Sequence, residues 1–136
     1  SQDGMGHMGL ALLNDGDVVL LPDPCYPVFI TGVKLGGGVP YYYHLTKEHN
    51  FLPNVKEIPD DVADKAKMMI VSLPANPVGS VGSPELYQEI VDFCNAHKIL
   101  LIHDNHTAAN IIVRNQIDHR HVFTDFDVIS GACLFK

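Results

Sequence analysis

The chain has 136 residues, of which 46% are hydrophobic and 18% are charged, and its formal net charge is −7. This composition is typical of one globular domain with a hydrophobic core and excludes a largely disordered chain, which has fewer apolar and more charged residues. The negative charge, with only 9 Lys and Arg, disfavours a nucleic-acid partner, because phosphate backbones attract basic side chains.

The first part of the chain predicts alternating helices and strands. Apolar residues recur at helical spacing over residues 5–13, so we predict a helix that begins at residues 1–3. The fully apolar run 18–21 predicts a buried parallel strand, and the prolines of residues 22–27 end it. Three segments follow in order: a helix over 28–35, a strand over 39–43 and a polar loop over 44–53.

The second part continues the alternation. It predicts a helix over 60–67, a strand over 68–73, a helix over 84–97 and a strand over 99–102. Ser83, Pro84 and Glu85 fit the N-cap and first turn of the longer helix. Further along, residues 107–113 fit a helix or an extended segment, and residues 128–134 predict one more strand. The sequence therefore predicts an α/β domain with a mainly parallel sheet flanked by helices.

The cysteines and the N-terminal residues indicate in which cellular compartment the protein works. Cys25, Cys94 and Cys133 have spacings that match no zinc or redox motif, so we expect reduced thiols and a cytoplasmic protein. No apolar stretch reaches the roughly 18 residues of a membrane span, and no basic region typical of a signal peptide precedes the first helix. We expect no membrane partner, and the abrupt start at Ser1 suggests a piece of a longer chain.

Polar side chains follow two neighbouring strands of the predicted sheet. Asn76 follows the run 68–73, and Asp104 follows the run 99–103. Because ligands of open parallel sheets bind outside the carboxyl ends of the strands, we expect Asn76 and Asp104 to face one ligand. The first turn of the first helix offers free backbone N–H groups to a phosphate, and Tyr26 offers a ring for stacking.

These four features together describe a site for pyridoxal phosphate. An ionised carboxylate beside the pyridine nitrogen keeps that nitrogen protonated, and the protonated ring then acts as an electron sink. Other cofactors fit less well. Of the eight histidines, His103 and His106 are close in sequence, as are His119 and His121, but two ligands fall short of the three or four that zinc needs, so we expect no native metal site. The first strand is not followed by the glycine pattern of dinucleotide-binding folds.

On these residues the chain resembles the large domain of fold-type I, class I/II pyridoxal-phosphate-dependent aminotransferases, especially the aspartate and LL-diaminopimelate aminotransferase branch. The resemblance is carried, in order, by Ser-Gln-Asp-Gly at 1–4, Gly-Asp-Val-Val-Leu at 16–20, Asp-Pro-Cys-Tyr-Pro at 23–27, Asn-Pro-Val-Gly at 76–79 and Asp-Asn at 104–105. It implies pyridoxal 5′-phosphate as cofactor, with the phosphate at Ser1, Gln2 and Asp3, the ring against Tyr26, the phenolic oxygen at Asn76 and the pyridine nitrogen at Asp104.

Two positions bear on catalysis within this resemblance. Thr107 stands where the family usually has a tyrosine that also binds the phenolic oxygen. Lys136 lies near the family's spacing for the Schiff-base lysine, and it is the catalytic candidate, although the serines that usually precede that lysine are missing.

The resemblance also implies a larger enzyme than this chain. Residues 1–136 would form a partial cofactor-binding large domain, family-like to about residue 105 and divergent over 106–136. The implied reaction transfers an amino group between an amino acid and a 2-oxo acid, in a full-length homodimer, and we expect the chain alone to be inactive. The alternative is a non-catalytic remnant that acts as a binding or interaction module.

Overall fold

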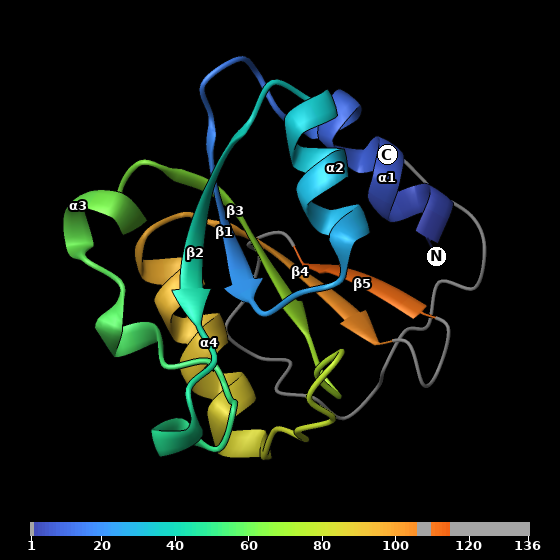
Figure 1. Cartoon of the computed structure of the whole chain (residues 1–136). Coiled ribbons are helices and arrows are strands. Elements are labelled where there is room, and N and C mark those ends of the chain that lie inside the picture. The colour runs from blue at the N-terminus through green and yellow to red at the C-terminus, as the bar shows by residue number, and fades with distance from the viewer. Residues whose placement is uncertain (1, 106–109, 115–136) are drawn as a thin grey trace.

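The computed structural model describes residues 2–105 and 110–114. Within them, five strands form one sheet in the spatial order β2-β1-β3-β4-β5 (Figure 1). The strands are Val18–Asp23 (β1), Val39–His44 (β2), Ala66–Ser72 (β3), Leu100–Asn105 (β4) and Asn110–Arg114 (β5). The first four are parallel, and β5 is antiparallel to β4. The predicted α/β class with a mainly parallel sheet is confirmed.

Helices flank this sheet on both faces. In the described part of the chain they are α1 (Gln2–Leu12), α2 (Pro27–Leu35), α3 (Asp60–Ala63) and α4 (Pro84–Ala96), with 3-10 turns η1 (Lys47–His49) and η2 (Val55–Glu57). Figure 1 shows α1 and α2 beside each other on one face of the sheet and α4 on the other. The predicted cap of α4 is confirmed, because the Ser83 hydroxyl oxygen accepts a hydrogen bond from the backbone N–H of Leu86.

The structure differs from the prediction over residues 60–67 and decides part of the open prediction over residues 107–113. The helix predicted over 60–67 is wrong in its second half: α3 ends at Ala63, and β3 begins at Ala66. The charges of Lys65 and Lys67 resemble an exposed helix face, but Lys67 is an outward-facing strand residue between buried neighbours. Of residues 107–113, those from Asn110 are extended, and the strand predicted over 128–134 lies outside the described residues.

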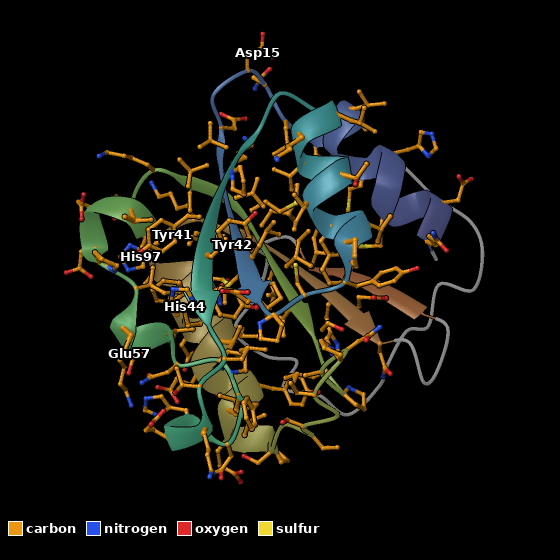
Figure 2. The ribbon with its side chains drawn as sticks, viewed as in Figure 1. Asp15, Tyr41, Tyr42, His44, Glu57 and His97 are labelled. Carbon is orange, nitrogen blue, oxygen red and sulfur yellow. The ribbon has the colours of Figure 1, made fainter. Side chains whose placement is uncertain are left out.

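Each face of the sheet carries its own hydrophobic cluster, because successive strand residues point to opposite sides. The cluster under α1 and α2 includes Met5, Val19, Leu21, Phe29, Val33, Met68, Ile70 and Ile102. The cluster under α4 and the loop after β2 includes Leu20, Tyr43, Leu45, Met69, Val71, Ile90 and Cys94. Figure 2 shows this alternation at the sheet edge, where Tyr41 and Tyr42 lie on opposite sides of β2.

Glycines allow α1 and α2 to cross at close range. A Cβ atom on Gly9, Gly32 or Gly36 would overlap backbone atoms of the other helix or its cap. Glycine in a helix interior is destabilising by about 0.5–1 kcal/mol relative to alanine, so close packing is the physical reason for glycine at these positions. The crossing fixes α1 against the unit formed by β1 and α2, and with it the position of the α1 N-terminus.

The order of the strands creates a switch point between β1 and β3. The chain leaves β1 through α2 on one face of the sheet and leaves β3 toward α4 on the other face. In open α/β sheets, ligands bind outside the carboxyl ends of the strands at such a switch point. The segments after β1, β3 and β4 are therefore where a functional site is expected.

Candidate functional site

Asp104 is a buried carboxylate at the carboxyl end of β4. Its side chain is 7% exposed, and it lies in register with Ser72 at the end of β3. Because side chains alternate along a strand, both residues point to the face that carries Ile70 and Ile102, the face covered by α1 and α2. A carboxylate offers acceptor oxygens and a negative charge, the chemistry that suits a ligand with a protonated nitrogen.

Asn76 lies in a tightly held turn after β3. The Ala75 N–H donates to the Ser80 carbonyl at 2.8 Å, and the Ser80 hydroxyl donates to the Asn50 carbonyl at 2.9 Å. Gly79 has a φ angle of +77°, a conformation that glycine adopts without steric cost. These contacts hold the half-buried Asn76 in the segment that follows the carboxyl end of β3, the strand next to β4.

Tyr26 is the N-cap residue of α2, in the short connection that follows β1. Its backbone is extended, and Pro27 occupies the first helical position, where a missing N–H costs nothing. The Tyr26 ring packs edge-on against Phe29, with ring centroids 6.1 Å apart. Because Phe29 is fully buried, this contact anchors the half-buried Tyr26 ring at the carboxyl end of β1.

Gln2 and Asp3 form the exposed first turn of α1. The first backbone N–H groups of a helix lack partners within the helix, which makes this end suitable for a phosphate. Met5 follows in the next turn and belongs to the same core cluster as Ile102, which lies two residues before Asp104 in β4. The start of α1 therefore belongs to the layer that covers the Asp104 face of the sheet.

The structure thus places Tyr26, Asn76 and Asp104 after the carboxyl ends of β1, β3 and β4, on the same side of the sheet where these strands end. Three other predicted positions, Ser1, Thr107 and Lys136, lie outside the described residues.

His103 supports this site, although no local sequence pattern indicates it. Its Nε2 atom lies 2.9 Å from the Leu73 carbonyl oxygen, and its ring packs edge-on against Tyr87 at a centroid distance of 5.3 Å. Burial lowers the pKa of His103, against smaller opposing effects of the Leu73 carbonyl and the Asp104 carboxylate. The imidazole is therefore neutral at pH 7, with Nε2–H as donor to Leu73.

Ser72 was also missed, and its signal in the sequence is a hydroxyl at the end of an otherwise apolar strand. The residue is 6% exposed, and its Oγ atom has no hydrogen-bond partner among the described residues. Buried hydroxyls without partners are uncommon, because desolvation is not compensated. Only the strand register reveals that this hydroxyl lies beside Asp104.

Other histidines pair with single acidic residues. These pairs are His7–Asp3, His44–Asp23, His49–Glu57 and His97–Asp64. In the part of the chain that the structure describes, no three His, Cys, Asp or Glu residues lie together as metal ligands would. Across the same residues, no helix has the length and apolar character needed to cross a membrane.

Comparison with known proteins identifies the family. The sequence model of class I and II aminotransferases matches residues 4–106, the part that contains Tyr26, Asn76 and Asp104. The chain belongs to this family. It is 42% identical over 104 residues to an LL-diaminopimelate aminotransferase of Halothermothrix orenii and 42% identical over 105 residues to that of Aquifex aeolicus. These matches cover 76% and 77% of the chain but 27% of each relative, so the chain spans about a quarter of the length of these aminotransferases.

Solved aminotransferase structures share the fold. An N-succinyldiaminopimelate aminotransferase described as probable, from Thermus thermophilus, matches with a TM-score of 0.73 and 30% identity over 77% of this chain and 28% of that one. The structure of apo-BacF from Bacillus subtilis matches with a TM-score of 0.74 and 35% identity over 76% of this chain and 26% of that one.

Class I and II aminotransferases use pyridoxal 5′-phosphate, and the residues at this edge of the sheet fit that group. The Asp104 carboxylate suits a protonated ring nitrogen, the Asn76 amide suits a phenolic oxygen, and Tyr26 offers an aromatic face. The first turn of α1 adds backbone N–H groups for a phosphate. These groups therefore match the phosphate, the phenolic oxygen and the pyridine nitrogen of the cofactor.

Proposed function

We propose that this chain provides cofactor-binding residues of a pyridoxal-phosphate-dependent aminotransferase. The observation that carries the proposal is the buried Asp104 carboxylate at the carboxyl end of β4, in a segment that matches the class I and II aminotransferase family. The reaction moves an amino group between an amino acid and a 2-oxo acid. When bound, the cofactor supplies an electron sink for the substrate carbanion.

The proposal gives each site residue a separate task. Asp104 accepts a hydrogen bond from the protonated pyridine nitrogen and stabilises that proton through its negative charge. Asn76 donates its amide N–H to the phenolic oxygen, and Tyr26 stacks on the ring. Backbone N–H groups at Ser1, Gln2 and Asp3 bind the phosphate.

Lys136 is the proposed catalytic lysine. Its amine would bind the cofactor covalently and afterwards move the proton of the substrate carbon. The proposal further treats residues 1–136 as a partial large domain, family-like to about residue 105 and divergent over 106–136. We further propose that the full-length enzyme is a cytoplasmic homodimer. We expect the chain alone to be inactive.

Titration of the purified chain with pyridoxal phosphate tests the role of Asp104. We expect a new visible absorbance band and saturable binding. Asp104→Asn removes the charge and should weaken binding at least tenfold, because hydrogen bonds to charged groups contribute about 1.5–3 kcal/mol. Asp92→Asn is the matched control, because Asp92 is exposed on α4 and bonds Gln88. Equal affinity of wild type and Asp104→Asn would contradict the role of Asp104.

Borohydride reduction followed by peptide mapping tests the role of Lys136. Reduction should trap the cofactor on Lys136, and Lys136→Arg should abolish the trapped product. Label scattered over surface lysines such as Lys47, Lys65 and Lys98 would instead contradict Lys136 as the catalytic residue. Failure of the wild-type chain to bind the cofactor would favour the alternative, a non-catalytic binding module.

A further inference from the structure

Ser72 is the buried polar residue at this edge of the sheet to which the proposed mechanism gives no task. Its side chain is 6% exposed, and no described residue forms a hydrogen bond with its hydroxyl. A hydroxyl in such surroundings loses its hydration without compensation. The apolar residues before it in β3 show that the strand is built for burial, so a serine at this position needs a local reason.

The strand register supplies that reason. Ser72 is paired with Asp104 across β3 and β4, and the two side chains point to the same face of the sheet. Neighbouring strands lie about 4.8 Å apart, a separation that a serine hydroxyl and an aspartate carboxylate on paired residues can bridge when the serine adopts another staggered rotamer. His103 and Asn105 point to the opposite face, because side chains alternate along β4.

We infer that Ser72 is a positioning residue for Asp104. When the cofactor is bound, the Ser72 hydroxyl donates a hydrogen bond to one carboxylate oxygen, and the other oxygen accepts a hydrogen bond from the protonated pyridine nitrogen. A carboxylate has two oxygens and about four acceptor positions, so it can accept the hydrogen bonds of the hydroxyl and of the pyridine nitrogen at the same time. The hydroxyl holds the carboxylate in the orientation that faces the ring and favours its ionised form. This inference rests on the proposed role of Asp104 in cofactor binding.

Two substitutions separate the hydroxyl from the space that it fills. Ser72→Ala removes the hydroxyl, and Ser72→Thr keeps it on a side chain favoured in strands. Each variant is compared with wild type in its affinity for pyridoxal phosphate, measured by equilibrium dialysis. The signal of the ¹⁵N-labelled pyridine nitrogen reports whether that nitrogen keeps its proton. Thermal unfolding without cofactor reports any effect on the fold itself.

We expect Ser72→Ala to bind pyridoxal phosphate about ten- to a hundredfold more weakly, the range for loss of one hydrogen bond to a charged group. Its ¹⁵N signal should shift toward that of the neutral ring. Ser72→Thr should retain affinity within about twofold and the wild-type ¹⁵N signal. Without cofactor, Ser72→Ala should unfold at the same or a higher temperature, because it removes a buried hydroxyl that has no described partner.

Three results would overturn the inference while the proposed function stands. These are wild-type affinity in Ser72→Ala, equal loss in Ser72→Ala and Ser72→Thr, and a lower unfolding temperature of cofactor-free Ser72→Ala, which indicates a structural role. Failure of the wild-type chain to bind pyridoxal phosphate would overturn the proposed function, and the inference with it.

Discussion

The Nε2 atom of His103 lies 2.9 Å from the carbonyl oxygen of Leu73, so one imidazole joins β4 to the start of the turn that carries Asn76. The contact is on the face of the sheet opposite to Asp104. Two successive residues of β4 therefore lie on opposite faces of the sheet: Asp104 is the proposed cofactor-binding carboxylate, and His103 supports the neighbouring turn.

The first prediction concerns pH. Burial lowers the pKa of His103 below 6.5, so the unfolded chain takes up a proton there before the folded chain does. The stability linked to His103 is therefore complete above about pH 6.5 and is lost as the pH falls toward the lower folded-state pKa. His103→Gln keeps a donor for Leu73 but does not titrate, so wild type should lose stability relative to this variant on acidification.

Urea unfolding at about pH 7.5 and about pH 5.5 measures this difference. His44→Gln is the control, because His44 is exposed at the end of β2. A His103→Gln variant that loses as much stability as wild type between the two pH values would contradict the prediction.

The second prediction concerns the close crossing of α1 and α2. Gly32→Ala places a methyl group against the Met5 carbonyl oxygen, and overpacking of this kind typically destabilises by about 1–3 kcal/mol. Gly6→Ala is the matched control, because its new Cβ would lie 3.6 Å from Val28 Cγ2, an ordinary contact. Alanine at position 6 should stabilise α1 by about 0.5–1 kcal/mol. Chemical denaturation of both variants tests whether Gly32→Ala lowers the free energy of unfolding while Gly6→Ala raises it.

The third prediction concerns a buried hydrogen bond under α4. The Tyr43 hydroxyl donates to the Ile70 carbonyl at 2.7 Å and joins β2 to β3 across β1. Tyr43→Phe leaves that buried carbonyl without this donor and should lower the free energy of unfolding by about 1–2 kcal/mol. Tyr42→Phe should change it much less, because Tyr42 is half-exposed. Similar values for the two variants would show that the bond contributes nothing measurable.

The fourth prediction concerns thiol reactivity. Burial raises the pKa of Cys94 to about 12, and its Sγ atom contacts the sulfur of Met69 in the core. Because the thiolate is the reactive form, Cys94 should resist alkylation in the folded chain. Cys25 is half-buried, so iodoacetamide should label Cys25 before Cys94. Mass spectrometry of time points in buffer and in urea measures the order; labelling of Cys94 at the same rate in both would contradict it.

The strands and the polar residues at their ends were predictable because their signals are local. An apolar run bounded by Pro22 or by Asp104 predicts a buried strand without knowledge of its neighbours. The N-cap at Ser83 is equally local, since one hydroxyl and one N–H three residues later define it. The resemblance then indicated the family that the comparison confirmed.

The features that were missed depend on pairing between distant segments. The register that places Ser72 beside Asp104, and the contact of His103 with Leu73, arise from the alignment of β3 with β4, which a single sequence does not encode locally. The extended conformation from Asn110 likewise depends on pairing with β4. The boundary at Ala66 was missed because charges in the preceding turn mimic a helix face.

The position of β3 beside β1 has a consequence for how the fold forms. β2 and α3 lie between these two strands in the chain, yet β1 and β3 pair directly. Contacts across long loops close at an entropic cost and tend to form late in folding. Tyr26 and Asn76 follow β1 and β3, so the two residues come together only when this late contact has formed. A ligand that binds both would slow the opening of the sheet at this pair of strands and protect their amides from hydrogen exchange.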